Sequence, residues 1–296
     1  MSDPIDADLA RRLVRGQFPQ WADLPVTPVE PGGWDNRTFR LGDDLAIRMP
    51  AKAIYAASIA KEQAWLPRLA PQLPLPIPAP VGLGAPGEGY PWPWSVNAWL
   101  PGETALSGEA DRLTLARDIA AFLTALQACD AQGGPAAGVH CFHRGGDLSV
   151  YDGETRDSVA LLGDRIDASA VMAVWQTALA SRWERAPVWV HGDVAPGNLL
   201  VDGGRLSAVI DFGTTCVGDP ACDLAIAWTF LQGESREAFR AASPLDADTW
   251  ARGRGWTLWK ALKVWAALPD ANPDGAAQCP RIVADLVAEH QALATA

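Results

Sequence analysis

The chain has 296 residues, 49% of them hydrophobic, which is enough for two modest domains or for one unit built from two lobes. Its 24 basic and 35 acidic residues give a net charge of −11, which argues against nucleic-acid binding because that requires a basic surface. No apolar run is long enough to span a bilayer, and the acidic start differs from a signal peptide, so we expect a cytoplasmic protein without a membrane partner.

The cysteines are odd in number and lack the Cys-x-x-Cys spacing of metal or redox motifs, so we expect reduced thiols, some of them buried. They are Cys129, Cys141, Cys216, Cys222 and Cys279. Cys141 and His143 are close in sequence, but this pair alone is weak evidence for zinc.

The first third of the chain combines helical and strand patterns. Apolar residues at helical spacing predict a helix from Asp6 to Phe18, and a second helix is expected from Ile54 to Leu66. Between them, three short runs separated by glycine-containing turns predict antiparallel strands. The runs are Val26–Glu30, Thr38–Leu41 and Leu45–Met49, and the turns are Pro31–Trp34 and Gly42–Asp44.

A proline-rich segment follows, with nine prolines from Pro67 to Pro93, and it cannot form a long helix. Because Leu73, Leu75 and Ile77 alternate with these prolines, we interpret the segment as extended chain packed along the sheet rather than as a flexible linker. Further strands are expected at Val81–Leu83 and Pro93–Leu100.

After Pro101-Gly102-Glu103 the composition favours helices, interrupted by a polar loop at Ala131–Gly153. The expected helices are Asp111–Cys129, Ala168–Arg185, Asp219–Leu231, Asp246–Leu268 and Cys279–Leu293. A strand-rich first third and a helix-rich remainder predict an α+β fold of two segregated lobes. We place an N-terminal antiparallel sheet lobe at residues 1–97 and a larger helical C-terminal lobe at residues 98–296.

Three polar residues, Asp193, Asn198 and Asp211, adjoin short apolar runs whose pattern is strand, loop, strand, turn, strand. Rigid strand ends can hold such groups over one point, as metal-assisted phosphoryl transfer requires. Each residue alone has an ordinary structural explanation: an Asx turn, a strand cap and a helix start, respectively. It would be a coincidence if all three structural explanations applied together at this spacing, so the functional explanation is favoured.

Here the sequence resembles the aminoglycoside phosphotransferase family, small-molecule kinases with a two-lobed protein-kinase-like fold. The resemblance rests on three motifs: His191-Gly192-Asp193 with Asn198 five residues after the aspartate, Asp211-Phe212-Gly213, and Gly218-Asp219-Pro220-x-x-Asp223-Leu224-Ala225. The first has the spacing of the protein-kinase catalytic loop, with glycine in place of arginine.

The resemblance implies a reaction and roles for the central residues. Asp193 is expected to accept or orient the proton of the attacking hydroxyl, while Asn198 and Asp211 supply oxygens to Mg²⁺. ATP or GTP is the implied phosphate donor. His191 is expected to brace the catalytic loop rather than act as a base, and Asp223 to hydrogen-bond the backbone of that loop.

Asp219, before Pro220, fits a helix N-cap, which makes it structural support for the site. On the nucleotide side, Arg48 stands where kinases carry a phosphate-binding lysine, with Glu62 as its expected partner. The lysine role could instead have moved to Lys52 or Lys61, and Arg48 and Glu62 could be an ordinary surface ion pair.

Other nucleotide contacts follow from position alone. Gly33 and Asn36 lie in the place of the phosphate-covering loop, although the segment lacks Gly-x-Gly-x-x-Gly. Asn97 has the gatekeeper position before the hinge between the lobes. The hinge residues, whose backbone groups would contact the purine edge, are Ala98, Trp99 and Leu100.

Groups that bind the acceptor are expected around the loop before Glu154, in Cys216–Asp223 and in the last helices. Five tryptophans of the last third are interpreted mainly as core, and four acidic residues as solvated helix faces. These are Trp228, Trp250, Trp256, Trp259 and Trp265, and Glu234, Glu237, Asp246 and Asp248.

The favoured function is therefore a small-molecule kinase, monomeric or homodimeric. Its acceptor would be a hydroxyl of an antibiotic (aminoglycoside-like, macrolide or nucleoside) or of a related metabolite. The alternative is a catalytically silent nucleotide-binding regulatory module, for which Arg48 is the best support. A protein kinase is disfavoured, because no Ala-Pro-Glu segment follows Asp211-Phe212-Gly213 at a suitable distance.

Overall fold

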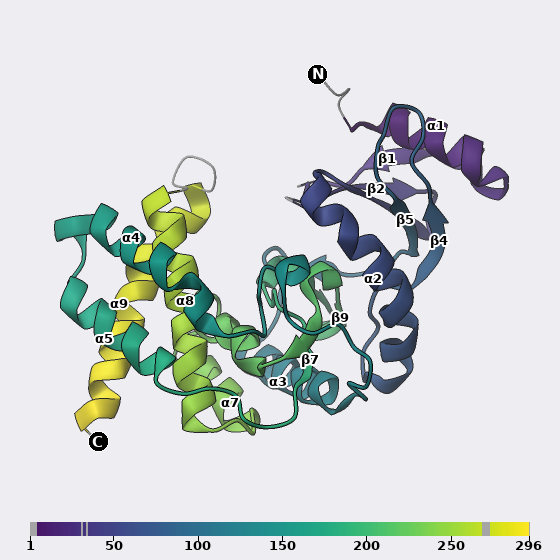
Figure 1. Ribbon diagram of the computed structural model, residues 1–296. Helices are drawn as coiled ribbons and strands as arrows, with labels where there is room; N and C mark the ends of the chain where they lie inside the picture. Colours follow the sequence, from purple (N-terminus) through teal and green to yellow (C-terminus); the bar gives the residue numbers. More distant parts are fainter. Residues whose placement is uncertain (1–4, 31, 34, 268–272, 296) are drawn as a thin grey trace.

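The computed structural model describes residues 5–30, 32–33, 35–267 and 273–295 and shows two lobes (Figure 1). A sheet with its helices, purple to blue in Figure 1, forms one lobe, and long helices form the far end of the other. Short strands lie between these two parts. The predicted two-lobed α+β fold is confirmed. None of the helices in the described ranges is long and apolar enough to cross a membrane.

The N-terminal sheet is antiparallel throughout, in the order β1-β2-β3-β5-β4, and the five expected strands are present. They are β1 (Val26–Pro28), β2 (Asn36–Leu41), β3 (Leu45–Pro50), β4 (Pro80–Gly84) and β5 (Trp94–Ala98). The predicted helix at the start is α1 (Ala7–Gln17), capped by Asp6. Pro31 and Trp34 of the predicted first turn, and residues 1–4 of the acidic start, lie outside the described residues.

The register of this sheet separates an apolar face from a polar one. Ile47 lies opposite Phe39 and Val96, and all three belong to a small core that includes α1. One residue further along β3, Arg48 lies opposite Thr38 and Ser95. Since neighbouring residues of a strand point to opposite faces, Arg48 is directed away from that core, toward α2 and the larger lobe.

Helix α2 (Ala53–Leu69) continues through Pro67, so the predicted end at Leu66 is wrong by one turn. Proline removes one hydrogen bond, but the helix ends two residues later, where a 3₁₀ turn (Ala70–Gln72) takes over. The hydrogen bond that Pro67 removes therefore belongs to the last turn of the helix.

The proline-rich segment packs differently from the prediction. Ile77 is buried in the core of the larger lobe together with Leu66 and Leu69, and Leu73 and Leu75 pack against the same cluster. The N–H of Val209 also donates to Pro76 O, at 3.2 Å. Residues 73–77 therefore lie against the C-terminal core rather than along the sheet, where their apolar side chains are removed from water, and the segment joins the sheet only at β4.

The larger lobe contains the expected helices with altered ends and two further helices, α4 and α7, that sequence patterning did not predict. The helices are α3 (Arg112–Ala128), α4 (Asp152–Leu162), α5 (Ala168–Leu179), α6 (Ile226–Thr229), α7 (Gly233–Ala242), α8 (Ala247–Ala267) and α9 (Pro273–Thr295). Both α4 and α7 are rich in polar residues, so their own sequence pattern does not predict a helix. Packing of α4 on α8 and of α7 on α3 stabilises them instead.

Two further helix boundaries and one helix type were predicted wrongly. Helix α5 stops at Leu179 instead of Arg185, and α9 begins at Pro273 instead of Cys279. The segment expected to be a helix from Asp219 is a 3₁₀ helix (Pro220–Ala225) followed by the single turn of α6. Leu268, the predicted end of α8, is not among the described residues. The predicted loop before α4 contains only short 3₁₀ turns.

The predicted strand, loop, strand, turn, strand order is confirmed by β7 (Val188–Val190), β8 (Leu199–Asp202) and β9 (Arg205–Val209). Two unpredicted strands complete these small sheets: β6 (Glu103–Thr104) pairs with β8, and β10 (Cys216–Gly218) pairs with β7. All five cysteines are free and buried. Of the five tryptophans, Trp228, Trp250, Trp256 and Trp259 are core residues, as predicted, and the four acidic residues are exposed.

Candidate active site

The loop after β7 is held by His191, whose ring is fully buried. Its Nδ1 accepts a hydrogen bond from the Asp193 N–H at 3.2 Å, so Nε2 carries the proton and donates to Ile210 O at 3.0 Å. The ring also packs edge-on against Phe212, with 4.7 Å between centroids. His191 thus joins the Asp193 loop to the segment that carries Asp211.

Gly192 has to be glycine at this point. Its φ is +84°, and a Cβ would lie 2.8 Å from Thr214 O, closer than real contacts allow. The carboxylate of Asp223, 1% exposed, accepts hydrogen bonds from the N–H groups of His191 (2.9 Å) and Gly192 (2.7 Å). These backbone contacts are the ones expected of Asp223, and they fix the direction in which Asp193 leaves the loop.

Asp193, Asn198 and Asp211 are brought together at this loop. The Nδ2 of Asn198 donates to Asp193 O at 2.9 Å, and Asn198 O accepts from the Ile210 N–H at 2.9 Å. Asp211 follows with a left-handed φ of +65°, which turns the chain sharply after β9. The side chains of Asp193 and Asp211 remain 41% and 34% exposed, so both carboxylates are accessible.

Arg48 connects the N-terminal sheet to this loop. Its Nη1 donates to Glu62 Oε2 at 2.8 Å and its Nη2 to Asp211 Oδ1 at 2.6 Å. The side chains of Arg48 and Glu62 are 11% and 2% exposed, so this is not a surface ion pair. Burial raises the pKa of Glu62 above its ordinary value, although the Arg48 guanidinium opposes that shift. The planar fork of arginine reaches both carboxylates at once, which a lysine ammonium does less well.

The two lysines considered as substitutes lie elsewhere. Lys61 Nζ donates to Gly213 O at 2.8 Å and lies 3.2 Å from His140 Nδ1, so it ties α2 to the backbone after Asp211. Lys52 is exposed at the start of α2. Neither ammonium takes the position of Arg48 between Glu62 and Asp211.

The residues around Asp211 fit a magnesium ion. Because the Asn198 amide donates through Nδ2, its Oδ1 is available as a ligand, and the Asp211 carboxylate keeps one oxygen besides the one on Arg48. Mg²⁺ uses few protein oxygens and completes its shell with water and substrate phosphates. Within the described ranges no cluster of three or more His, Cys, Asp or Glu side chains could hold a metal ion alone.

Polar atoms without partners lie on the face of the sheet that carries Arg48. Both side-chain polar atoms of Asn97, the Oδ1 of Asn36 and the Oγ of Ser95 are buried and have no hydrogen-bond partner among the described residues. Buried polar groups are normally paired, so these positions fit a bound molecule that supplies the missing partners. Gly33 lies three residues before Asn36 in the chain, and its O accepts a hydrogen bond from Arg37 Nη1 at 2.7 Å.

The hinge is only partly free to contact a base. The N–H of Ala98 donates to Ala79 O at 2.8 Å, and that of Trp99 donates to Asp44 O at 2.7 Å. The N–H of Leu100 has no acceptor in the described part of the protein. Of the three expected hinge donors, Leu100 is therefore the one that remains for a ligand.

Sequence reasoning missed two cations near Asp193. Arg144 Nη2 lies 3.6 Å from Asp193 Oδ1, and Lys260 of α8 is close enough for its charge to act on the same carboxylate. Burial raises the pKa of Asp193, but the neighbouring charges, those of Lys260 and Arg144 first, together with a hydrogen bond from Asn198 outweigh it, so this pKa lies below its ordinary value. Neither residue belongs to a motif. The one signal in the sequence was that lysine is scarce, since Lys260 and Lys263 are the two lysines of residues 98–296.

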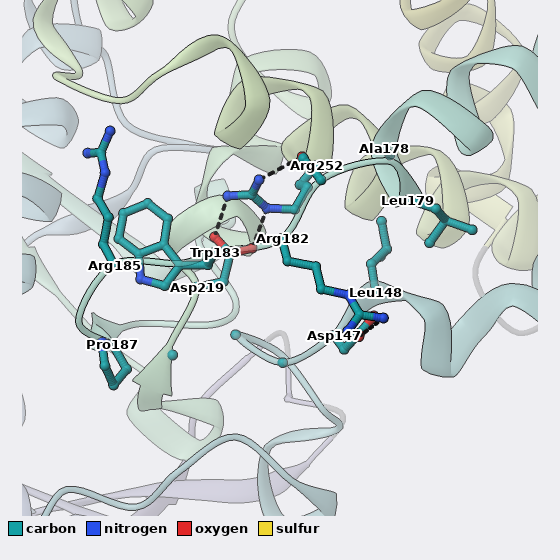
Figure 2. A pocket seen from close by; sticks show the side chains of 14 residues that line it. Asp147, Leu148, Ala178, Leu179, Arg182, Trp183, Arg185, Pro187, Asp219 and Arg252 are labelled. Atoms are coloured by element: carbon teal, nitrogen blue, oxygen red, sulfur yellow. Dashed lines mark hydrogen bonds and ion pairs between the residues drawn. The ribbon is translucent and has the colours of Figure 1, made fainter.

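Asp219 caps the 3₁₀ helix through Ala221 N, as predicted, but its main contact is an ion pair that the sequence did not reveal. Arg252 Nε lies 2.7 Å from Asp219 Oδ2, and the two side chains are 5% and 8% exposed. Figure 2 shows this pair beside a cavity of about 350 Å³. Arginines 182 and 185 at that cavity also pair with carboxylates, and Asp193, Asn198 and Asp211 do not line it. Asp219 and this cavity are therefore structural surroundings of the loop.

We expect Arg252→Met to lower the free energy of unfolding by about 3–5 kcal/mol, because it leaves the Asp219 carboxylate buried without its partner. Chemical denaturation followed by tryptophan fluorescence measures this change. The double variant Asp219→Asn/Arg252→Met should recover part of the loss, since no buried charge remains. An Arg252→Met protein as stable as the wild type would show that the pair does not support the fold.

The fold and the cluster around Asp193 define an enzyme of the protein-kinase-like class. A family model described as the phosphotransferase enzyme family matches residues 26–256, and this chain belongs to that family. A comparison with curated proteins gave no match.

Solved structures share the fold over nearly the whole chain. The GDP and kanamycin complex of APH(2")-IIia is 19% identical with a TM-score of 0.76, and the match covers 95% of this chain and 98% of that one. Macrolide 2'-phosphotransferase MphH from Brachybacterium faecium is 22% identical with a TM-score of 0.58, covering 95% and 98%. ADP-bound APH(2'')-Ib is 16% identical with a TM-score of 0.60, covering 96% and 99%.

Proposed function

We propose that this phosphotransferase is a small-molecule kinase that moves the γ-phosphate of ATP or GTP onto a hydroxyl of an antibiotic or a related metabolite. The observation that carries the proposal is a hydrogen-bonded cluster. His191 and Asn198 each contact the Asp193 backbone and Ile210, the residue before Asp211. Arg48 bridges Glu62 and Asp211 from the other lobe. The aminoglycoside and macrolide enzymes of the same fold support an aminoglycoside-like, macrolide or nucleoside acceptor.

Asp193 receives the acceptor in this proposal. Its carboxylate is accessible, and its lowered pKa keeps it ionised at neutral pH, so it can accept a hydrogen bond from the attacking hydroxyl. The bonds from His191 and Asn198 to the Asp193 backbone limit its motion, which orients the hydroxyl toward the phosphate. His191, Asp219 and Asp223 support the site without touching substrate.

Asn198 and Asp211 are the proposed magnesium ligands, and the bound ion would offset the charge that develops on the phosphates. Arg48, ordered by Glu62, is placed to bind phosphate oxygens next to Asp211. Gly33 and Asn36 are proposed as further phosphate contacts. The hinge residues Ala98, Trp99 and Leu100 would contact the purine, with the free N–H of Leu100 as donor. Bound GDP and ADP in structures of this fold support a nucleotide donor.

We further propose a cytoplasmic enzyme, monomeric or homodimeric, that acts on a hydroxylated small molecule and not on nucleic acid. Its lobes are proposed to divide between residues 97 and 98. The two separate apolar clusters support this division, although Leu66, Leu69 and Ile77 pack in the larger one.

The test is nucleotide consumption with ATP or GTP and a panel of hydroxylated antibiotics and metabolites, followed by mass spectrometry of the acceptor. We expect one compound to gain a single phosphoryl group, and removal of Mg²⁺ with EDTA to lower the rate at least about 100-fold, restored by added Mg²⁺. Nucleotide binding without any phosphoryl transfer in a broad panel would favour the silent regulatory module instead.

A further inference from the structure

The C-terminal lobe presents an unusual set of charges to Asp193. The chain as a whole carries a net charge of −11, yet the groups of this lobe nearest to Asp193 include the cations Arg144 and Lys260. A third cation, Lys263, is already paired with Glu154 at 2.6 Å. Arg144 and Lys260 are therefore the cations of this lobe that face Asp193 without a closer carboxylate partner, although the charge of Asp35 also acts on Lys260.

The loop that presents Arg144 is held in a strained conformation. Phe142 and His143, the two residues before it, both have left-handed φ values, +51° and +54°. Such values are unfavourable for residues with side chains and persist only where the surroundings impose them. Here the hydroxyl of Tyr151 donates to Phe142 O at 2.8 Å.

Tyr151 in turn fixes this loop to α8, the helix that carries Lys260. Its ring stacks on Trp259 with 3.8 Å between centroids, and Trp259 Nε1 donates to Glu154 Oε2 at 2.6 Å. The loop of Arg144 and the helix of Lys260 are therefore parts of one rigid wall.

The two cations have spare binding capacity. Arg144 is 3.6 Å from Asp193, longer than a direct hydrogen bond, and its side chain is 12% exposed. The side chain of Lys260 is exposed, and none of the described residues forms an ion pair with it. The acidic groups whose charges act on Lys260 are Asp193 and Asp35. Neither is close enough to neutralise it by direct contact.

We propose that Arg144 and Lys260 bind an acidic group of the acceptor, a carboxylate or a phosphate, while the hydroxyl of the same molecule lies on Asp193. The proposal rests on the kinase function proposed above and narrows its acceptor to hydroxylated acids. Because Arg144 is next to Asp193, the acid and the hydroxyl are separated by only a few bonds. A polyamine acceptor would instead bring its own positive charge against these two cations.

The nucleotide is the less suitable partner for these cations. Its phosphates are expected beside Arg48 and Asp211, and among the described residues neither Arg144 nor Lys260 forms an ion pair with Asp211. Arg48 spans from the N-terminal sheet to Asp211, whereas Arg144 and Lys260 come from the C-terminal lobe and surround Asp193. An acidic group bound by Arg144 and Lys260 would therefore lie nearer to the acceptor hydroxyl at Asp193 than to the nucleotide.

The test compares hydroxylated acids with their neutral counterparts at equal concentration: D-gluconate with D-gluconamide, and glycerol 3-phosphate with glycerol, with kanamycin as the polyamine. Wild-type protein, Lys260→Met and Arg144→Lys are assayed for phosphorylated product by mass spectrometry. Arg182→Met, which removes a 77% exposed arginine at the outer cavity, serves as the matched control. Lys260→Met removes an exposed side chain, so the fold should be retained.

We expect the wild type to phosphorylate at least one acid about 10-fold faster than its neutral counterpart. Lys260→Met should lower kcat/KM for that acid about 10-fold and leave the KM of the nucleotide unchanged. Arg144→Lys keeps the charge but not the forked guanidinium, so it should lower this kcat/KM by a smaller factor, whereas Arg182→Met should not change the preference for the acid. A specific loss for the acid would not follow from a merely structural role of Lys260, which would lower both rates equally.

The inference is overturned if acids give no more product than the neutral compounds or kanamycin, including the case in which no acid is phosphorylated. It is also overturned if Lys260→Met affects acid and neutral compounds alike. The kinase function is judged separately, by Mg²⁺-dependent nucleotide consumption without acceptor and by product from any compound. That function fails only if both are absent.

Discussion

Asp193→Asn should lower kcat about 1,000-fold while leaving the KM for the nucleotide nearly unchanged. The amide has the shape of the carboxylate but no negative charge, so it accepts a hydrogen bond from the attacking hydroxyl far less well. Because the Asp193 side chain is 41% exposed and its backbone makes the contacts to His191 and Asn198, the loop should keep its conformation. Steady-state phosphorylation of the best acceptor, with nucleotide binding measured in parallel, gives both quantities.

A matched control for this variant is Asp147→Asn. Asp147 is also a partly exposed aspartate facing an arginine, Arg182, but it lies at the outer cavity of Figure 2. Its replacement should change kcat by less than about 2-fold. If Asp193→Asn retained a third or more of the wild-type kcat, Asp193 would not be the group that receives the hydroxyl.

Arg48→Met should be the most damaging change on the nucleotide side. It leaves Glu62, 2% exposed, without the guanidinium that compensates its buried charge, so we expect a loss of about 3–5 kcal/mol in unfolding free energy. It also removes the bond to Asp211, so the KM for the nucleotide should rise. Arg48→Lys keeps the charge but cannot make two fixed, diverging hydrogen bonds, and it should cost about 1.5–3 kcal/mol.

The control for Arg48 is Arg205→Met, which removes another arginine with two short bonds to a carboxylate, that of Asp118. The Arg205 side chain is 64% exposed, so water replaces the lost contact and the loss in unfolding free energy should be much smaller than for either Arg48 variant. Denaturant titration of the wild type, Arg48→Met, Arg48→Lys and Arg205→Met measures the loss in unfolding free energy for each variant. If the order were reversed, with Arg205→Met the more harmful, burial would not be what makes the Arg48 contact important.

The predicted and observed elements agree best where the chain pattern is local and strong. The strands before His191, after Asn198 and before Asp211 are short apolar runs bounded by turn residues, and each formed as expected. Polar helices such as α4 were missed because their apolar residues are few and their packing against α8 supplies the stability. Helix ends were misplaced for the same reason, since capping and tertiary contacts set them rather than periodicity.

The family, the order of the lobes and the loop that joins Asp193 to Asn198 could be predicted from the sequence, because spacings of a few residues fix which groups a short loop can bring together. Only the tertiary structure decided that Arg48 reaches Asp211, 163 positions away, that Asp219 is paired with Arg252, and that Arg144 and Lys260 surround Asp193. Such contacts join segments distant in the chain, and their energies depend on burial and on charges from other elements. No local pattern contains either quantity, so the class of reaction could be predicted from the sequence, whereas the charges that face Asp193 could not.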